Sequence, residues 1–158
     1  MRKYGWIALA AVAADQAVKE VSRHLAADVT LIPGVLRLTY AENTGMAFSL
    51  LSGRPWLLAA LSAALILLGW RILRRYRLGP LSGVAAMLML GGAVGNLIDR
   101  LLTGYVVDMF EVLLFRFAIF NVADASLTVG CVLMAASLLW RPREWSEKSH
   151  GDAQGNPT

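Results

Sequence analysis

The stretch that decides the fold is residues 55–70, PWLLAALSAALILLGW, which contains no charged side chain. The apolar run continues to about residue 73 and is followed by three arginines within residues 74–77. An α-helix needs about 20 residues to cross the roughly 30 Å of hydrocarbon in a bilayer, so this stretch predicts a transmembrane helix over residues 55–73. Two further runs predict spans over residues 81–99 and 120–140, each ending at or next to charged residues.

The composition of the whole chain also indicates a membrane protein. Of the 158 residues, 57% are hydrophobic and 16% are charged, and the mean hydropathy is +0.55. Soluble domains carry about 25% charged residues, so a soluble fold of this size would have to expose much of the apolar excess to water. The net charge of +4 does not indicate nucleic acid here, because the basic residues lie between apolar runs, and we expect no nucleic-acid partner. A single cysteine, Cys131, can form neither an internal disulfide nor a Cys-rich metal site.

The N-terminal segment has two interpretations. Residues 5–14 are apolar, follow Arg2 and Lys3 and end in small residues, which is also the pattern of a cleavable signal peptide. Apolar positions continue at helical intervals beyond residue 14, however, and Asp15 and Lys19 are four residues apart, a spacing at which they can pair on one helix face. A first span over about residues 4–22 would give an all-α polytopic membrane protein with four transmembrane helices.

The basic residues predict how these spans are oriented. With alternate loops assigned to opposite sides, nine basic residues fall on the side of the N-terminus: Arg2, Lys3, Arg71, Arg74, Arg75, Arg77, Arg141, Arg143 and Lys148. Five fall on the other side: Arg23, Arg37, Arg54, Arg100 and Arg116. Because cytoplasmic loops carry the excess of Lys and Arg, both termini are expected in the cytoplasm, with residues 23–54 and 100–119 outside.

The segments outside the spans differ in character. Residues 31–40, LIPGVLRLTY, combine a Pro-Gly turn with alternating apolar residues, so we expect a small extracytoplasmic β element there. This element and the stretch 101–119 are candidates for a lid over a site at the outer surface. Residues 144–158 are polar, and we expect them to form a disordered cytoplasmic tail.

Polar side chains near membrane depth are the candidates for function, because each costs free energy unless it is paired or lies in a cavity. The Asp15–Lys19 pair is most simply explained as a structural ion pair. Asn43 and Gly45 fit ordinary turn chemistry, although an asparagine side chain can also bind peptide backbone.

The outer end of the third span carries a second polar group. Gly91 and Gly95 form a small-residue face that allows close helix packing. Asn96 and Arg100 are four residues apart and therefore project from one helix face, from which both can reach the same ligand. An arginine at the end of a span also commonly reaches the lipid headgroups, so Arg100 has that interpretation as well.

Two carboxylates are the candidates for catalysis. Asp108 lies in an apolar stretch and Asp124 lies at the start of the last span, both on the predicted outer side. Asn121 and Asp124 also have the spacing of a helix capping box, which is a purely structural explanation for Asp124. Two adjacent carboxylates share one proton, so that one acts as a base and the other as an acid, which suits them to activate water. His24 and His150 are the two histidines of the chain, too few for a multi-histidine metal site, and we expect no metal and no cofactor.

Two other classes of protein use some of the same features. Small transporters also place Asp, Lys and Arg within the membrane, but they favour the bilayer midplane and internal repeats, and this sequence shows no repeat. A structural subunit needs only the small-residue helix faces, and it would leave Asp108 and Asp124 without a purpose.

Five short blocks together resemble bacterial lipoprotein signal peptidase, also called signal peptidase II. They occur in the family's order: DQxxK (15–19), NxGxAFS (43–49), GGAxGNxxDR (91–100), VDMF (107–110) and FNxAD (120–124). The resemblance implies a four-span transmembrane peptidase domain over residues 1–143. It also implies an aspartyl endopeptidase that cuts prolipoproteins before a diacylglyceryl-modified cysteine, and a retained first helix. One departure is Met109, since an aromatic residue often follows the aspartate directly in the family.

The resemblance also assigns roles to individual positions. Asp108 and Asp124 match the family's catalytic pair. Positions that hold substrate main chain and orient the site are matched by Asn43, Asn96, Arg100 and Asn121, and structural or supporting positions by Asp15, Lys19, Gly45, Gly92, Asp99 and Ala123. The expected partners are diacylglyceryl-modified prolipoproteins and membrane lipid. The expected protein is a monomer in the bacterial cytoplasmic (inner) membrane, with its active site near the outer face.

Overall fold

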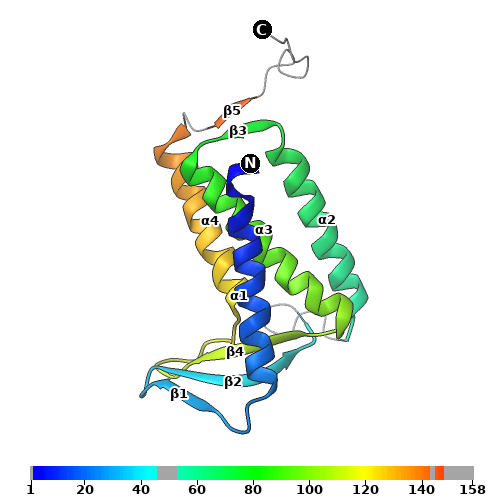
Figure 1. Cartoon of the computed structure of the whole chain (residues 1–158), viewed down its shortest axis with the longest axis vertical. Helices are drawn as coiled ribbons and strands as arrows, with labels where there is room; N and C mark the ends of the chain where they lie inside the picture. Colours follow the sequence, from blue (N-terminus) through cyan, green and yellow to red (C-terminus); the bar gives the residue numbers. More distant parts are fainter. Residues whose placement is uncertain (1, 46–52, 143–144, 148–158) are drawn as a thin grey trace.

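A computed structural model of the chain describes residues 2–45, 53–142 and 145–147. After a short 3-10 turn, η1 (Arg2–Tyr4), the described residues form four long helices: α1 (Gly5–Arg23), α2 (Pro55–Leu73), α3 (Pro80–Leu102) and α4 (Val122–Trp140). The helices lie alongside one another, with the N-terminus near one end of the bundle and a small β-sheet at the other (Figure 1).

Three of these helices, α2, α3 and α4, are long and apolar enough to cross a membrane, which confirms the three apolar spans predicted from the sequence. The first helix, α1, does not meet the same standard of length and composition among the described residues. The reason is that α1 carries four charged residues, Asp15, Lys19, Glu20 and Arg23, of which Asp15 and Lys19 are fully buried.

The sheet at the far end of the bundle has three antiparallel strands in the order β1-β2-β4: β1 (Val29–Ile32), β2 (Leu36–Asn43) and β4 (Val106–Val112). The predicted β element is present as the hairpin of β1 and β2, which are joined by a turn in which Gly34 has a φ of +70°. The third strand, β4, lies within the stretch 101–119, which we expected to be lid-like. It pairs with β2, with Ala41 opposite Asp108 and Asn43 opposite Val106. This pairing brings the segment that contains Asn43 next to the segment that contains Asp108.

A second, two-stranded sheet lies at the opposite end of the bundle. It pairs β3 (Tyr76–Leu78) with β5 (Trp145–Glu147), so the tail that we expected to be disordered from residue 144 contains an ordered strand. The Trp145 ring packs edge-on against Tyr76 at 5.7 Å between centroids, and its Nε1 donates to Ser137 Oγ at 3.0 Å. These contacts explain why a short polar segment is held at this position. Residues 148–158 lie outside the described residues.

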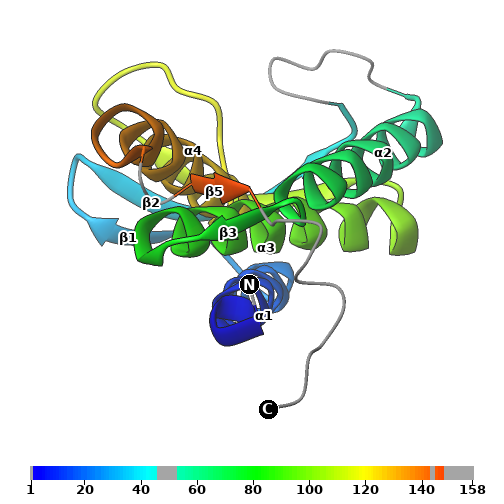
Figure 2. The same cartoon turned by 90° about the horizontal axis from the view of Figure 1, so that it is seen from above.

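Helix α3 is the centre of the bundle, with α1 on one side and α2 and α4 on the other (Figure 2). Its glycines permit this close packing. A Cβ added at Gly91 would come within 2.8 Å of Ala11 Cβ on α1, and one at Gly92 would collide with the main-chain oxygen of Ala123 on α4. The predicted small-residue face of Gly91 and Gly95 therefore packs closely against α1, whereas Gly92, which was not part of that face, brings the start of α4 close to α3.

Candidate active site

Asp108 is a buried carboxylate on the central part of β4, with 3% of its surface exposed. Asn43 Nδ2 donates to its Oδ2 at 2.9 Å from the paired strand β2, and Asn121 Nδ2 donates to its Oδ1 at 2.7 Å. Burial raises the pKa of Asp108 to about 6, the hydrogen bonds from the two asparagines oppose this rise, and the negative charge of Asp124 adds to it. The pKa of Asp108 is therefore much closer to neutral pH than that of an ordinary aspartate.

Asp124 lies in the first turn of α4 and takes part in the predicted capping box. Asn121 Oδ1 accepts a hydrogen bond from the Asp124 amide at 2.8 Å, and Asp124 Oδ2 accepts one from the Asn121 amide at 3.4 Å. The structural explanation for Asp124 is thus confirmed. Its other oxygen, Oδ1, has a further partner, because Asn96 Nδ2 on α3 donates to it at 2.8 Å.

Two asparagines connect the carboxylates. Asn121 Nδ2, which contacts Asp108, also lies 3.1 Å from Asn96 Oδ1, and Asn96 in turn donates to Asp124. A continuous hydrogen-bonded path therefore runs from Asp108 through Asn121 and Asn96 to Asp124. The structure thus brings a strand residue and a helix residue, sixteen positions apart, into one site, together with three of the four predicted substrate-binding residues.

The fourth predicted substrate-binding residue, Arg100, lies beside this path. Its Nη1 lies 3.2 Å from the main-chain oxygen of Asn96, and its Nη2 lies 3.4 Å from the main-chain oxygen of Gly45. Gly45 is itself held by a hydrogen bond from its amide to Asn43 Oδ1 at 3.0 Å. The turn at residues 43–45 therefore supports Asn43 and contacts α3 through Arg100. Residues 46–49 of the same sequence block lie outside the described residues.

Behind the asparagines lies a fully buried cluster of charged groups. The Lys19 ammonium is 2.7 Å from Asp15 Oδ2, as the spacing on α1 predicted, and also 2.9 Å from Asp99 Oδ2 on α3. The carboxylates also bind main chain, since Asp15 Oδ1 accepts from the Ala123 amide at 2.8 Å and Asp99 Oδ2 accepts from the Val107 amide at 3.0 Å. The contact of Lys19 with Asp99 could not be predicted from spacing, because it joins residues eighty positions apart.

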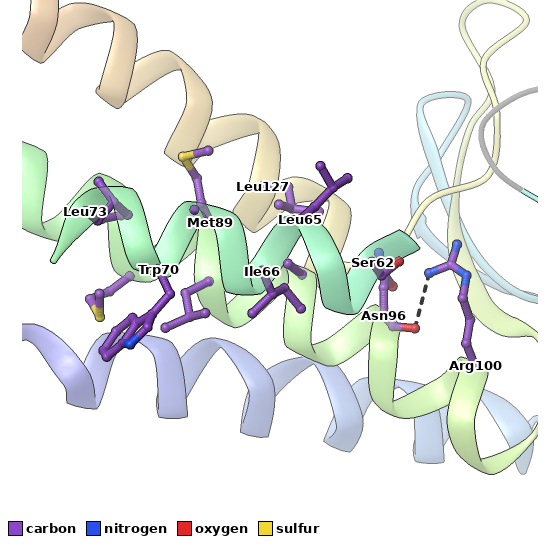
Figure 3. A pocket seen from close by; sticks show the side chains of 14 residues that line it. Ser62, Leu65, Ile66, Trp70, Leu73, Met89, Asn96, Arg100 and Leu127 are labelled. Atoms are coloured by element: carbon purple, nitrogen blue, oxygen red, sulfur yellow. Dashed lines mark hydrogen bonds between the residues drawn. The ribbon is translucent and has the colours of Figure 1, made fainter. Parts of the chain in front are cut away.

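An apolar cavity of about 410 Å³ adjoins this path at Asn96. Its walls come mainly from α2 and α3, with Leu127 of α4, and they include Leu65, Ile66 and Trp70 (Figure 3). Asn96 and Arg100 lie at one end of the cavity, and the other end is purely apolar. Because Asn96 also contacts Asp124, the apolar cavity and the carboxylates are adjacent parts of one site.

The chain matches the family model described as signal peptidase (SPase) II over residues 7–140. The chain belongs to the signal peptidase II family. It is 42% identical to a lipoprotein signal peptidase of Lactiplantibacillus plantarum, over 85% of this chain and 95% of that protein. It is 39% identical to the lipoprotein signal peptidase of Bacillus subtilis, over 86% of this chain and 92% of that protein.

Solved structures give the same result for the fold. A bacterial membrane enzyme determined by the in meso method at 2.3 Å resolution matches with a TM-score of 0.83 and 30% identity, over 94% of both chains. A second, determined at 1.9 Å resolution, matches with a TM-score of 0.76 and 29% identity, over 89% of this chain and 95% of the other. Membership of the signal peptidase II family makes the chain a bacterial multi-pass membrane protease that removes signal peptides from prolipoproteins.

Proposed function

We propose that this protein is an aspartyl endopeptidase in which Asp108 and Asp124 form the catalytic pair. The observation that carries the proposal is the path from Asp108 through Asn121 and Asn96 to Asp124. Hydrogen bonds from asparagine amides orient both carboxylates without neutralising them. The raised pKa of Asp108, about 6, provides a group that can hold the shared proton near neutral pH.

The chemistry requires one proton on the pair. The ionised carboxylate takes a proton from a water molecule, and the water oxygen attacks the scissile carbonyl carbon. The protonated carboxyl donates its proton to the carbonyl oxygen, giving a neutral tetrahedral intermediate. When the C–N bond breaks, the leaving nitrogen takes up the proton that was removed from water, and one hydroxyl group of the intermediate returns its proton to the other carboxylate. This leaves a carboxylic acid product, a free amine and a pair that again holds one proton. No covalent enzyme intermediate and no metal take part in this sequence.

The apolar cavity is the proposed site for the diacylglyceryl chains of the substrate. It is lined by aliphatic and aromatic side chains over most of its length, as acyl chains require, and its polar end at Asn96 and Arg100 adjoins Asp124. Acyl chains held there place the peptide bond next to the carboxylates before reaction, which lowers the entropic cost of the chemical step. Asn43 and Arg100 then bind the main chain around the cut, while the buried side chains of Asn96 and Asn121 hold the two carboxylates.

The proposed arrangement in the membrane has four spans, with α1 as the fourth. The polar side chains of α1 at Asp15 and Lys19 face α3, while Trp6, Leu9 and Val21 are exposed on its outer surface. A helix with its charges paired inside and apolar residues outside can lie in lipid. The excess of basic residues at the end with the N-terminus supports an orientation with both termini in the cytoplasm and the carboxylates near the outer face.

The experiment that tests the substrate class compares two prolipoproteins that differ only in the diacylglyceryl group. The purified, detergent-solubilised protein is expected to cut the lipidated form immediately before the modified cysteine, as mass spectrometry of the products would show. The unmodified form is expected to be cut at least about 100-fold more slowly, because it lacks the chains that position the bond. Equal cleavage of both forms, or cleavage at another bond, would overturn the assignment.

A further inference from the structure

The orientation of the Asn96 side-chain amide is fixed by three contacts. Its oxygen accepts from Lys19 Nζ at 3.3 Å and from Asn121 Nδ2 at 3.1 Å, and its Nδ2 donates to Asp124 Oδ1 at 2.8 Å. Rotating the amide by a half turn would bring its NH₂ group against two donors and its oxygen against a carboxylate oxygen. Only one of the two orientations therefore aims a donor at Asp124.

Lys19 supplies one of the donors that enforce this orientation. Each of its three N–H groups has one acceptor nearby. An ammonium group has three N–H donors, and the three acceptors around Nζ are Asp15 Oδ2, Asp99 Oδ2 and Asn96 Oδ1. Both the lysine and Asp15 are fully buried, so water cannot replace any of these partners. Two N–H groups are held by the carboxylates, and the third points at Asn96.

The second donor, Asn121, is held independently. Its Oδ1 accepts from the Asp124 amide at 2.8 Å as the cap of α4, which directs its Nδ2 toward Asp108 and Asn96. The cap can therefore remain in place when Lys19 is replaced. Without the lysine, Asn96 would keep one donor to its oxygen and lose the charged one, which is the stronger of the two.

We propose that Lys19 is a positioning residue of the reaction: through its third N–H it locks the Asn96 amide with Nδ2 toward Asp124 and so orients that carboxylate toward the substrate. This role rests on the proposed function, because it matters only if Asp124 reacts. It differs from a purely structural ion pair in one respect. A structural pair affects how much protein folds, whereas a positioning residue affects the turnover of the protein that has folded.

The experiment uses the double substitution Asp15→Asn/Lys19→Met, which removes one charge of each sign and leaves the net charge of the buried cluster unchanged. Cleavage of a lipidated prolipoprotein is measured per mole of folded protein, quantified by gel filtration and thermal unfolding. We expect kcat to fall by about 100-fold, the effect of a small misplacement of a reacting group, and KM to stay within about 3-fold of the wild-type value. A variant with the wild-type kcat, or one that cannot be purified folded, would overturn the inference.

A double-mutant cycle tests whether Lys19 acts through Asn96. Asn96→Ala is combined with Asp15→Asn/Lys19→Met. The kcat is measured for the wild type, for each of these two variants and for their combination. Once Asn96 is alanine, the loss of Lys19 is expected to change kcat by no more than about 2-fold, because the group that it orients is absent. If the fold-reductions in kcat caused by Asn96→Ala and by Asp15→Asn/Lys19→Met multiply in the combined variant, Lys19 acts by another route and the inference is overturned.

Asp108→Asn and Asp124→Asn are assayed alongside these variants to separate the two claims. If both are inactive while Asp15→Asn/Lys19→Met has the wild-type kcat, only the role of Lys19 fails. If Asp108→Asn or Asp124→Asn cuts at the wild-type rate, the catalytic pair fails, and the positioning role fails with it.

Discussion

Asn121 donates a 2.7 Å hydrogen bond to the carboxylate of Asp108 from a position where it also caps the helix that carries Asp124. One side chain therefore fixes the start of α4 and joins the two candidate catalytic groups. The structural and the functional explanations of the capping box are consequently not alternatives. The cap keeps Asp124 in place on α4, and the Nδ2 group of the cap residue, Asn121, donates to Asp108.

The pH dependence of cleavage is expected to be bell-shaped, because the reaction requires one proton on the pair of carboxylates. The raised pKa of Asp108 predicts an alkaline limb near pH 6. Asn43→Ala removes a hydrogen bond that favours the ionised form of Asp108 and should move the alkaline limb of kcat upward by about half a pH unit to one unit. Tyr40→Phe, also on β2, serves as the control, with an unchanged profile. A shift of the Asn43→Ala limb to lower pH would contradict the assigned contact.

The stability of the folded protein should also depend on the proton of Asp108. The pKa of this group is about 6 in the folded protein against 3.8 for the free side chain, so the folded state binds the proton more tightly. The resulting stabilisation is complete below about pH 3.8 and is lost as the pH rises through about 6. Between pH 5 and 7.5 the wild type should lose about 1 kcal/mol relative to Asp108→Asn, or about 2–4 °C in Tm. A difference in Tm between the wild type and Asp108→Asn that does not vary with pH would show that the pKa of Asp108 is not raised in the folded protein.

Close packing of α3 against α4 should be sensitive to a single methyl group. A Cβ at Gly92 would collide with the main-chain oxygen of Ala123, so Gly92→Ala is expected to lower the free energy of unfolding by about 1–3 kcal/mol and to reduce cleavage. Gly5→Ala is the matched control, because a Cβ there meets no atom within 4 Å. A Gly92→Ala protein with the Tm and activity of Gly5→Ala would show that the two helices are not packed this closely.

The two-stranded sheet of β3 and β5 should contribute to stability without taking part in the reaction. Trp145 packs on the buried cluster of Leu78, Ala86 and Met87 and donates to Ser137, so Trp145→Ala should lower the free energy of unfolding by about 2 kcal/mol. The kcat of the folded protein should be unchanged, since β5, which begins at Trp145, lies at the opposite end of the bundle from β4, which carries Asp108 (Figure 1). An unchanged Tm would show that β5 does not hold the tail in solution.

Local patterns in the sequence were sufficient to predict several elements. The three apolar spans follow from length and composition, the β1–β2 hairpin from its Pro-Gly turn, and the capping box from the spacing of Asn121 and Asp124. Each depends on residues that are close in the chain. The i to i+4 pair of Asp15 and Lys19 was predictable for the same reason.

The remaining features depend on contacts between distant residues, which a single sequence does not reveal. β4 is a strand because β2 pairs with it across some seventy residues, and the apolar stretch around Asp108 has no turn signal to mark it. The contact of Lys19 with Asp99 joins α1 to α3, and β5 forms because β3 lies opposite it. The meeting of Asp108 and Asp124 in one site was expected from topology and family resemblance, whereas the asparagines that link them could be located only in the structure.

The most direct test of the central claim is cleavage of a diacylglyceryl-modified prolipoprotein by Asp108→Asn and Asp124→Asn, beside the wild type and Glu20→Gln. Glu20 is an exposed carboxylate paired with Arg23 on α1, so Glu20→Gln controls for the loss of a negative charge. We predict that the wild type and Glu20→Gln cut before the modified cysteine at equal rates, and that both aspartate variants are folded but at least about 10⁴-fold slower. Wild-type cleavage by either aspartate variant would show that its carboxylate is not catalytic.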